Sequence, residues 1–222
     1  MKTAHCLLAV VALCSGVSVM AADIPLYPTG PAEDAAFIRF VNGAAETLQV
    51  IAQKGQPPLK LESAKPVSSF FPVTAKSAIK GTLISGSKHL ELEVKAQPGE
   101  FATVVVLPDD KGIKQITVHD VPDDFNGLKA SLGFFNLDSR CANASLRPAG
   151  RSADLFKGVA QGSLQRRSIN PVKLAVQLVC ANANIGPALD LGELKAGERY
   201  SVLLLPTAAG PRLLSATDNL SH

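Results

Sequence analysis

The chain of 222 residues contains no tryptophan, two tyrosines and nine phenylalanines, so flat aromatic side chains are scarce. Carbohydrate-binding β-sandwich proteins usually present such rings for stacking against sugars. Phe70-Phe71 and Phe134-Phe135 could each expose one ring, but both pairs lie in apolar runs that are typical of a core. The scarcity of aromatic residues therefore argues against a sugar-stacking surface.

A strong excess of one charge is also absent. Lysine and arginine number 22 and aspartate and glutamate 19, which gives a formal net charge of +3 at pH 7. No run of basic residues accompanies this small excess, whereas nucleic-acid binding depends on contacts with many phosphates. We therefore expect no nucleic-acid partner.

Catalytic and metal-binding patterns are missing as well. Beyond the first twenty residues the histidines are His89, His119 and His222, and no Gly-x-Ser-x-Gly turn occurs. We interpret His119 and its neighbour Asp120 as an exposed pair rather than a catalytic one. The cysteines are not spaced like metal ligands. We predict no catalytic residue, no metal site and no cofactor; we leave enzymatic activity open and favour a non-catalytic subunit.

The first residues have the layout of a secretory signal peptide. Lys2 precedes an apolar run, Cys6–Leu13, and the small residues Val19 and Ala21 stand where a signal peptidase reads them. We predict a signal peptide over residues 1–21, cleaved after Ala21 or Ala22. No later run is long and apolar enough to cross a bilayer. We expect an exported, periplasmic protein with no membrane span after cleavage.

Cleavage would leave two of the four cysteines, Cys141 and Cys180. Exported proteins fold in an oxidising compartment, where paired cysteines usually form disulfides. We predict a Cys141–Cys180 disulfide, with two buried thiols as the alternative.

The chain repeats itself. The phrase GEFATVVVLP (Gly99–Pro108) returns as GERYSVLLLP (Gly197–Pro206). Further matched pairs are Asn42 with Asn136, Gly112 with Gly210 and Asp120 with Asp218. We interpret the chain as two copies of one unit, roughly 23–122 and 128–222.

Each copy consists of short, β-branched apolar segments separated by turn residues, with no long helical periodicity. We predict an all-β fold of two tandem β-sandwich domains related by internal duplication, 22–122 and 123–222, with about seven strands each. The glycine that opens each repeated phrase predicts a tight turn. The proline that closes each phrase is expected to end the strand.

Arginine is distributed unevenly between the copies. The first copy contains only Arg39, and the second contains Arg140, Arg147, Arg151, Arg166, Arg167, Arg199 and Arg212. Guanidinium groups suit paired contacts with carboxylates of a polymer or a protein. We expect Arg166 and Arg167 to be exposed, on a loop that enters a strand, and to contact a partner; the alternative is a solvated face.

Two segments resemble one protein family. PLYPTGPAEDAAFIRFVNGAAETLQV (Pro25–Val50) resembles the mature start of the alginate biosynthesis protein AlgF family, and RRSINPVKLAVQLV (Arg166–Val179) resembles an Arg-x-Ile-Asn-Pro-Val-Lys strand of that family. The segments lie at opposite ends of the chain, in the family's order. Arg39, Asn42, Arg166, Asn170 and Pro171 match the family pattern.

The resemblance implies a periplasmic accessory protein for O-acetylation of an exopolysaccharide, of the alginate or the related cellulose type, and hence a role in biofilm material. Its implied partners are periplasmic O-acetyltransferases, a membrane-bound O-acyltransferase and the polysaccharide itself. The residues expected to bind a partner or the polymer are Arg39, Asn42, Arg166, Arg167 and Asn170. Two alternatives remain open: an enzyme that carries or transfers acetyl groups in the same pathway, and a structural or chaperone-like envelope protein.

Overall fold

The computed structural model describes residues 35–52, 57–122 and 126–221. The expected signal peptide and the family-like residues before Ala35 lie outside this part of the chain. Within it, none of the elements is a helix of the length and apolar character needed to cross a membrane.

The first half of the described chain forms two four-stranded sheets. One sheet has the strand order β4-β1-β7-β8, and the other has the order β3-β2-β5-β6. The strands are β1 (Ala35–Asn42), β2 (Leu48–Ile51), β3 (Leu59–Leu61), β4 (Phe71–Thr74), β5 (Ile79–Ser85), β6 (Lys88–Val94), β7 (Phe101–Asp109) and β8 (Gly112–Asp120).

The second half repeats this arrangement, with the sheet orders β12-β9-β15-β16 and β11-β10-β13-β14. The strands are β9 (Ala130–Asn136), β10 (Asn143–Pro148), β11 (Phe156–Ala160), β12 (Ser163–Ile169), β13 (Val172–Cys180), β14 (Ala183–Leu194), β15 (Arg199–Thr207) and β16 (Gly210–Thr217). A single-turn 3-10 helix, Ser139–Cys141, follows β9. Adding eight to a strand number in one half therefore gives its equivalent in the other.

The pairing register is repeated as well as the strand order. Asn42 lies opposite Val106 in the parallel pair β1–β7, and Asn136 lies opposite Leu204 in the parallel pair β9–β15. The two repeated phrases are thus inner strands at the same place in separate sheets, as the duplication predicts. The prediction of an all-β, duplicated sandwich fold is confirmed, with eight strands in each half rather than about seven.

Of the two predictions for the ends of the repeated phrases, the tight turn at the glycine is confirmed and the strand end at the proline is wrong. Gly99 and Gly197 have φ values of 75° and 76°, a left-handed conformation that favours glycine in a tight turn. However, β7 and β15 continue one residue beyond Pro108 and Pro206. Each proline lies one pair away from a two-residue hairpin loop, where opposite residues exchange no hydrogen bonds, so its missing N–H costs nothing.

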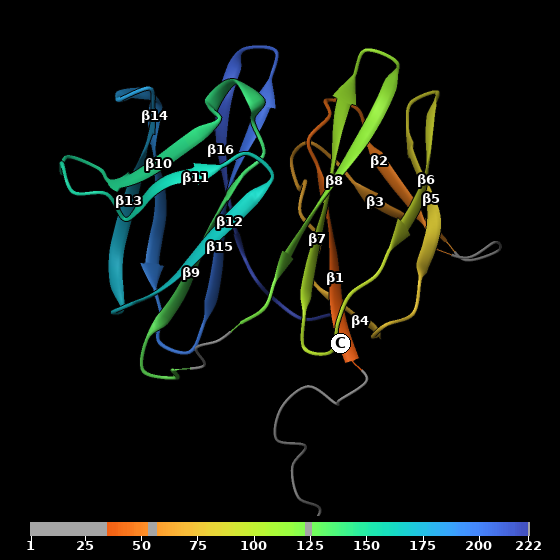
Figure 1. The fold of residues 1–222 in the computed structure, drawn as a ribbon, viewed down its shortest axis with the longest axis horizontal. Helices are drawn as coiled ribbons and strands as arrows, with labels where there is room; N and C mark the ends of the chain where they lie inside the picture. Colours follow the sequence, from red (N-terminus) through yellow and green to blue (C-terminus); the bar gives the residue numbers. More distant parts are fainter. Residues whose placement is uncertain (1–34, 53–56, 123–125, 222) are drawn as a thin grey trace, which may run out of the picture.

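The four sheets stack side by side, with the second half on the left of Figure 1 and the first half on the right. Each half has its own apolar core between its two sheets. A third buried cluster joins the halves; it comprises Val41, Val105, Leu107, Val118, Phe135, Leu137, Leu203 and Leu205. The sheet that contains β7 therefore packs face to face on the sheet that contains β15.

This packing explains the uninterrupted apolar runs of the repeated phrases. In β7, Val104 and Val106 contact the core of the first half, and Val105 and Leu107 contact the cluster between the halves. Side chains alternate between the faces of a strand, so a strand that is covered on both faces must be apolar throughout.

Two further features tie distant segments together. The predicted disulfide between Cys141 and Cys180 is confirmed, with a Cα–Cα distance of 5.5 Å. The end of the chain crosses to the other half, where Leu220 forms a parallel bridge with Phe70 beside β4 (Figure 1). The backbone N–H of Phe70 donates to the carbonyl of Asn219 at 2.8 Å, and that of Ser221 donates to the carbonyl of Phe70 at 2.7 Å.

Candidate functional site: a buried charge cluster between the halves

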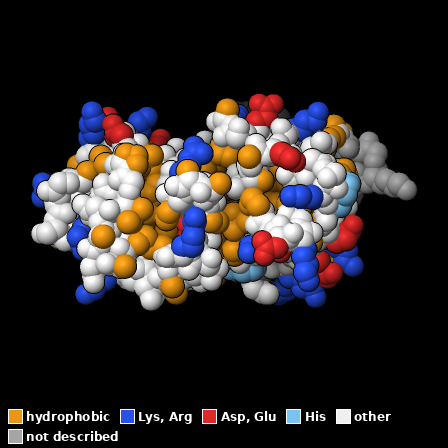
Figure 2. All heavy atoms as spheres, turned by 90° about the horizontal axis from the view of Figure 1, so that it is seen from above, with side chains coloured by type: hydrophobic (Ala, Val, Ile, Leu, Met, Phe, Trp, Pro, Cys, Tyr) orange, Lys and Arg blue, Asp and Glu red, His pale blue; other side chains and the backbone are white. Residues whose placement is uncertain are grey.

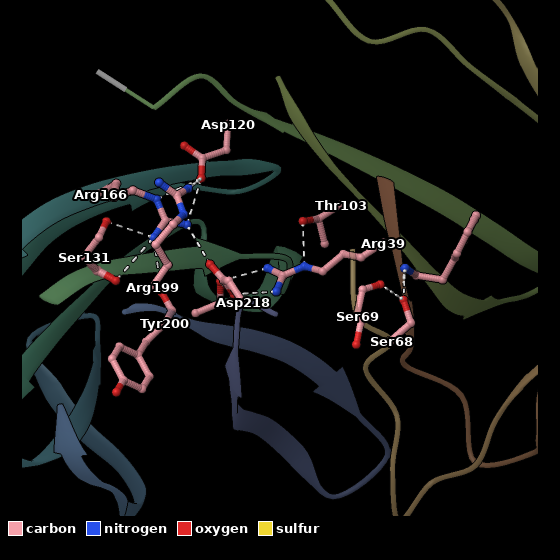
Figure 3. A network of polar contacts seen from close by, with 12 residues as sticks. Arg39, Ser68, Ser69, Thr103, Asp120, Ser131, Arg166, Arg199, Tyr200 and Asp218 are labelled. Carbon is pink, nitrogen blue, oxygen red and sulfur yellow. Dashed lines mark hydrogen bonds and ion pairs between the residues drawn. The ribbon is translucent and has the colours of Figure 1, made fainter. Parts of the chain in front are cut away.

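The family-like residue Arg39 lies on β1 and points across to the second half (Figure 3). Its side chain is fully buried. Its Nη1 donates to Oδ1 of Asp218 at 2.7 Å, Nη2 donates to Ser201 at 2.8 Å, and Nε donates to Thr103 at 3.0 Å. The guanidinium carbon also lies 4.5 Å from the centre of the Phe70 ring. Every face of this guanidinium is therefore occupied by the protein itself.

Arg166 makes the reciprocal contact from the second half. Its Nε donates to Oδ2 of Asp120 at 2.8 Å, and its Nη2 donates to Oδ2 of Asp218 at 3.2 Å. Its Nη1 donates to the backbone carbonyls of Tyr200 at 3.2 Å and Ser131 at 3.5 Å. The aspartate of each half thus binds an arginine of the other half, and Asp218 binds both arginines.

Arg199 completes the cluster. Its Nη2 donates to Oδ2 of Asp120 at 3.0 Å, and its guanidinium carbon lies 4.9 Å from the centre of the Phe101 ring. Its Nε is buried and has no partner in the described part of the chain. Burial lowers the pKa of Arg199, and the nearby charge of Arg166 lowers it further.

Asp218 lies at the centre of the cluster, and its carboxyl group is almost completely buried. Burial raises the pKa of this group, but Arg39 and Arg166 more than offset the effect, so the pKa lies below its ordinary value. Burial likewise lowers the pKa of Arg39, and Asp218 opposes that change. Removing one ion would leave another buried and uncompensated, which is a large energetic penalty.

The two halves supply different residues at equivalent positions of this cluster. Arg39 lies opposite Thr103 on β7, and its equivalent, Gly133, lies opposite Ser201 on β15. A Cβ atom added to Gly133 would lie 2.8 Å from Nη2 of Arg166. The guanidinium of Arg166 therefore lies over Gly133, in the space that a side chain would need there.

The two other arginines of the cluster replace phenylalanines. Arg166 lies opposite Gly133. In the first half the register of β1 and β4 ends with Ile38 opposite Phe71, so the next residue, Phe70, takes the corresponding place, and its ring contacts Arg39. Arg199 likewise stands where the first half has Phe101. At these two positions the first half has rings and the second half has guanidinium groups, and Arg199 stacks on its own equivalent, Phe101.

Asn42, also expected at a binding site, has a buried position at the end of β1. Its side-chain nitrogen donates to the carbonyls of Glu46 at 2.8 Å and Leu61 at 2.9 Å. Its equivalent, Asn136, donates to the carbonyls of Cys141 at 2.7 Å and Val159 at 2.9 Å. The matched asparagines thus connect the same strands in both halves, which accounts for their presence in both copies.

The remaining candidates lie at the surface. Arg167 and Asn170 are exposed, and Nη1 of Arg167 donates to the carbonyl of Leu155 at 2.6 Å. The expectation of a loop for Arg166-Arg167 is wrong, because both lie within the edge strand β12. The expectation of exposure is wrong for Arg166, whose side chain is only 11% exposed. Side chains alternate between the faces of a strand, so Arg166 lies on the face toward the first half and Arg167 lies on the opposite face, where it is exposed.

Nothing in this cluster resembles a nucleophile with its base, because its carboxylates are bound by arginines. The interpretation of His119 and Asp120 as an exposed pair is wrong, because Asp120 is buried and bound by Arg166 and Arg199. His119 instead pairs with Glu100, with Nδ1 and Oε1 2.9 Å apart, at the edge of the first half. Within the described ranges, no group of three or more His, Cys, Asp or Glu side chains could hold a metal ion. What the cluster can do is hold two sandwiches in one fixed arrangement.

The surface seen from above Figure 1 has no concentrated basic patch. On this face Lys and Arg side chains are scattered, and apolar side chains gather between them, over the region where the halves meet (Figure 2). Three of the eight arginines outside residues 1–34, namely Arg39, Arg166 and Arg199, are used inside the molecule. Two of the seven arginines of the second half, Arg166 and Arg199, therefore belong to the contact between the halves.

No family model and no curated protein sequence matches the chain. One solved structure with some similarity is the C-terminal domain of AlgF from P. aeruginosa, with 24% sequence identity over 40% of this chain and 98% of that chain and a TM-score of 0.35. The Bacillus anthracis TIE protein has 11% identity over 78% of this chain and 34% of that chain, with a TM-score of 0.26. A proposed cell adhesion protein from Bacteroides uniformis has 10% identity over 83% of this chain and 98% of that chain, with a TM-score of 0.28. The chain thus spans about a third of the TIE protein. Because the TM-scores are below 0.5, none of these likenesses supports a conclusion about function.

Proposed function

We propose that this chain is a non-catalytic periplasmic accessory protein of exopolysaccharide O-acetylation, which couples acetyl-transfer enzymes to one another or to the polymer. The proposal starts from the two segments that resemble the alginate biosynthesis protein AlgF family. A disulfide between Cys141 and Cys180 fits an oxidising compartment outside the cytoplasm.

One structural observation carries the proposal further. Arg39 and Arg166, one from each family-like segment, meet at the same carboxylate, Asp218. Two of the residues that match the family pattern, Arg39 and Arg166, therefore hold the two sandwiches together. That role suits a rigid adaptor, whose work depends on the relative position of two surfaces.

The test is the acetyl content of the exported polysaccharide. In a strain that lacks the chain, we expect acetyl content to fall while polymer continues to be made, and we expect the parent gene to restore it. Unchanged acetylation in the deletion strain would contradict the proposal. Loss of a surface fibre with normal acetylation would favour the structural or chaperone-like alternative.

A second experiment separates an adaptor from an acetyl-carrying enzyme. Purified protein is incubated with an aryl acetate donor, and its mass and the release of the aryl alcohol are followed. An adaptor gains no acetyl group and does not accelerate release. A stable gain of one acetyl group on a Ser or His, lost when polysaccharide is added, would establish the enzyme instead.

A further inference from the structure

An open groove runs along the junction of the two halves, on the side where the chain ends. Its volume is about 790 Å³. One wall comes from the segment between β3 and β4 and includes Pro66, Val67 and Ser69; the other comes from β16 and includes Ser215 and Thr217. Both walls are edges of sheets, because β16 is the last strand of its sheet and the segment before β4 borders β1.

The pairing register shows which backbone groups of β16 face the groove. The N–H of Asp218 donates to the carbonyl of Arg199, so residues 218, 216 and 214 point their backbone groups toward β15. Ser215 lies opposite Val202 at a position without hydrogen bonds, so its N–H and C=O point away from β15. Among the described strands, β16 pairs with β15 alone.

The opposite wall has the same property. The N–H of Asn42 donates to the carbonyl of Pro66, and the N–H of Ser68 donates to the carbonyl of Phe40. These two bonds flank the bridge between Val41 and Val67, so the N–H and C=O of Val67 point away from β1 and toward the groove.

The chain itself already fills the end of this groove with an extended segment. Asn219–Ser221 makes the two backbone hydrogen bonds to Phe70 described above. The edge next to Val67 therefore accepts a strand in the adjoining residues. Devices that usually protect an edge are few on β16: its pairing with β15 contains no bulge, and proline occurs only at its beginning, as Pro211.

We propose that this groove binds an extended polypeptide segment of a partner protein by strand addition to β16 and to the edge at Val67. Side chains of an added strand would alternate between the apolar floor, which includes Val67 and Leu214, and solvent. The bound segment should thus alternate apolar and polar residues and contain no proline at its paired positions. The inference concerns this surface alone and does not depend on the polysaccharide pathway.

The probe is a short synthetic peptide in which valine and threonine alternate between terminal lysines. We expect it to bind the full-length mature protein and to slow amide hydrogen exchange at Ser215 roughly tenfold at saturation. The same peptide with alternate backbone nitrogens methylated cannot complete the ladder, and we expect it not to bind. Equal binding of both peptides would overturn the proposal without any change to the protein.

Ser215→Pro removes the outward N–H without removing a β15–β16 hydrogen bond, and we expect it to abolish peptide binding. The matched control is Thr117→Pro, which lies opposite Val104 on β8 at the equivalent position of the first half and should bind like the parent. Loss of binding in both variants, or in neither, would overturn the proposal.

Two other occupants give distinct results. If sedimentation shows that the parent is a dimer that Ser215→Pro dissociates, the groove takes a second copy and the proposal is wrong. If alginate or cellulose oligosaccharides protect Ser215 and displace the peptide, the occupant is a carbohydrate and the proposal is also wrong.

Discussion

The two halves share their strand order and register but differ where they touch. The first half offers Arg39 with the rings of Phe70 and Phe101, whereas the second offers Gly133 with Arg166 and Arg199. Matched aspartates, Asp120 and Asp218, each reach an arginine of the other half. A duplicated unit has thus diverged into two complementary faces, and complementary faces specify one pairing better than identical ones.

The divergence also explains why the contact between halves tolerates so much buried charge. Asp218 alone receives hydrogen bonds from Arg39, Arg166 and Ser201. A buried ion pair is stabilising only when such additional hydrogen bonds satisfy both partners. The cluster meets that condition in all but one of its polar groups, the Nε of Arg199.

The largest effect on stability should come from breaking the reciprocal ion pairs between the halves. Arg39→Ala leaves Asp218 with less compensation in a dry site, and we expect the free energy of unfolding to fall by about 3–5 kcal/mol. Urea unfolding followed by circular dichroism measures this change. Arg167→Ala is the control, and a loss below about 1 kcal/mol for Arg39→Ala would contradict the assigned role.

The disulfide distinguishes the second half from the first. Replacing Cys141 and Cys180 together by serine should cost about 2–4 kcal/mol, since the bridge closes a long loop in the unfolded chain. Hydrogen exchange should accelerate first in β10 and β13, which border the bridge. Acceleration that begins in β2 and β5, their equivalents in the first half, would show that the halves do not differ in this way.

Gly133→Ala tests whether the guanidinium of Arg166 occupies the space that a side chain at position 133 would need. The added methyl group must displace the end of that side chain, so we expect a loss of about 1–2 kcal/mol. In an Arg166→Ala background the same change should cost less than about 0.5 kcal/mol, because nothing is left to displace. Equal costs in both backgrounds, measured by a double-mutant cycle, would rule out this contact.

Acid should weaken the contact between the halves through Asp218. Its pKa is lowered in the folded protein, so the unfolded chain binds a proton first as the pH falls. The stabilisation is complete above the ordinary aspartate pKa of about 3.9 and is lost at up to about 1.4 kcal/mol per pH unit as the pH falls toward the folded pKa. Asp218→Asn should remove this part of the pH dependence; an unchanged profile would assign it to other carboxylates.

The smallest effect is expected for Arg167. Its neighbour Arg166 faces the first half, whereas Arg167 is exposed and bonded only to a carbonyl. We expect Arg167→Ala to change the free energy of unfolding by less than about 0.5 kcal/mol. If this variant folds and still loses polymer acetylation in cells, Arg167 belongs to a partner contact; if Arg167→Ala unfolds the protein, its assignment to the surface is wrong.

Much of the fold could be predicted because the same pattern of strands and turns occurs twice in the sequence. The matched asparagines, the turn glycines and the apolar phrases each recur with a spacing that only a shared register explains. The effect of the prolines could not be predicted without that register. A proline is harmless at a pair without hydrogen bonds and disruptive at a hydrogen-bonded pair, and these two kinds of pair alternate along a strand.

The charge cluster was harder to predict, since its members come from distant parts of the chain. The resemblance singles out Arg39 and Arg166, but nothing next to them in the sequence shows that they face the other half. The alternation of apolar and polar residues that marks the buried face of a strand is absent around Arg166, because an arginine stands where an apolar residue would be expected. The matched pair Asp120 and Asp218 was the available signal, and it indicated the repeat without indicating the arginines.

The central claim is that reciprocal ion pairs make the two halves one cooperative unit, and native-state hydrogen exchange of the intact protein tests it most directly. We predict that amides of β7 and β15 exchange with the same free energy, equal to that of global unfolding, and that Arg39→Ala lowers both together. Exchange of β7 through an opening that leaves β15 protected, or a change confined to one half in Arg39→Ala, would contradict the account.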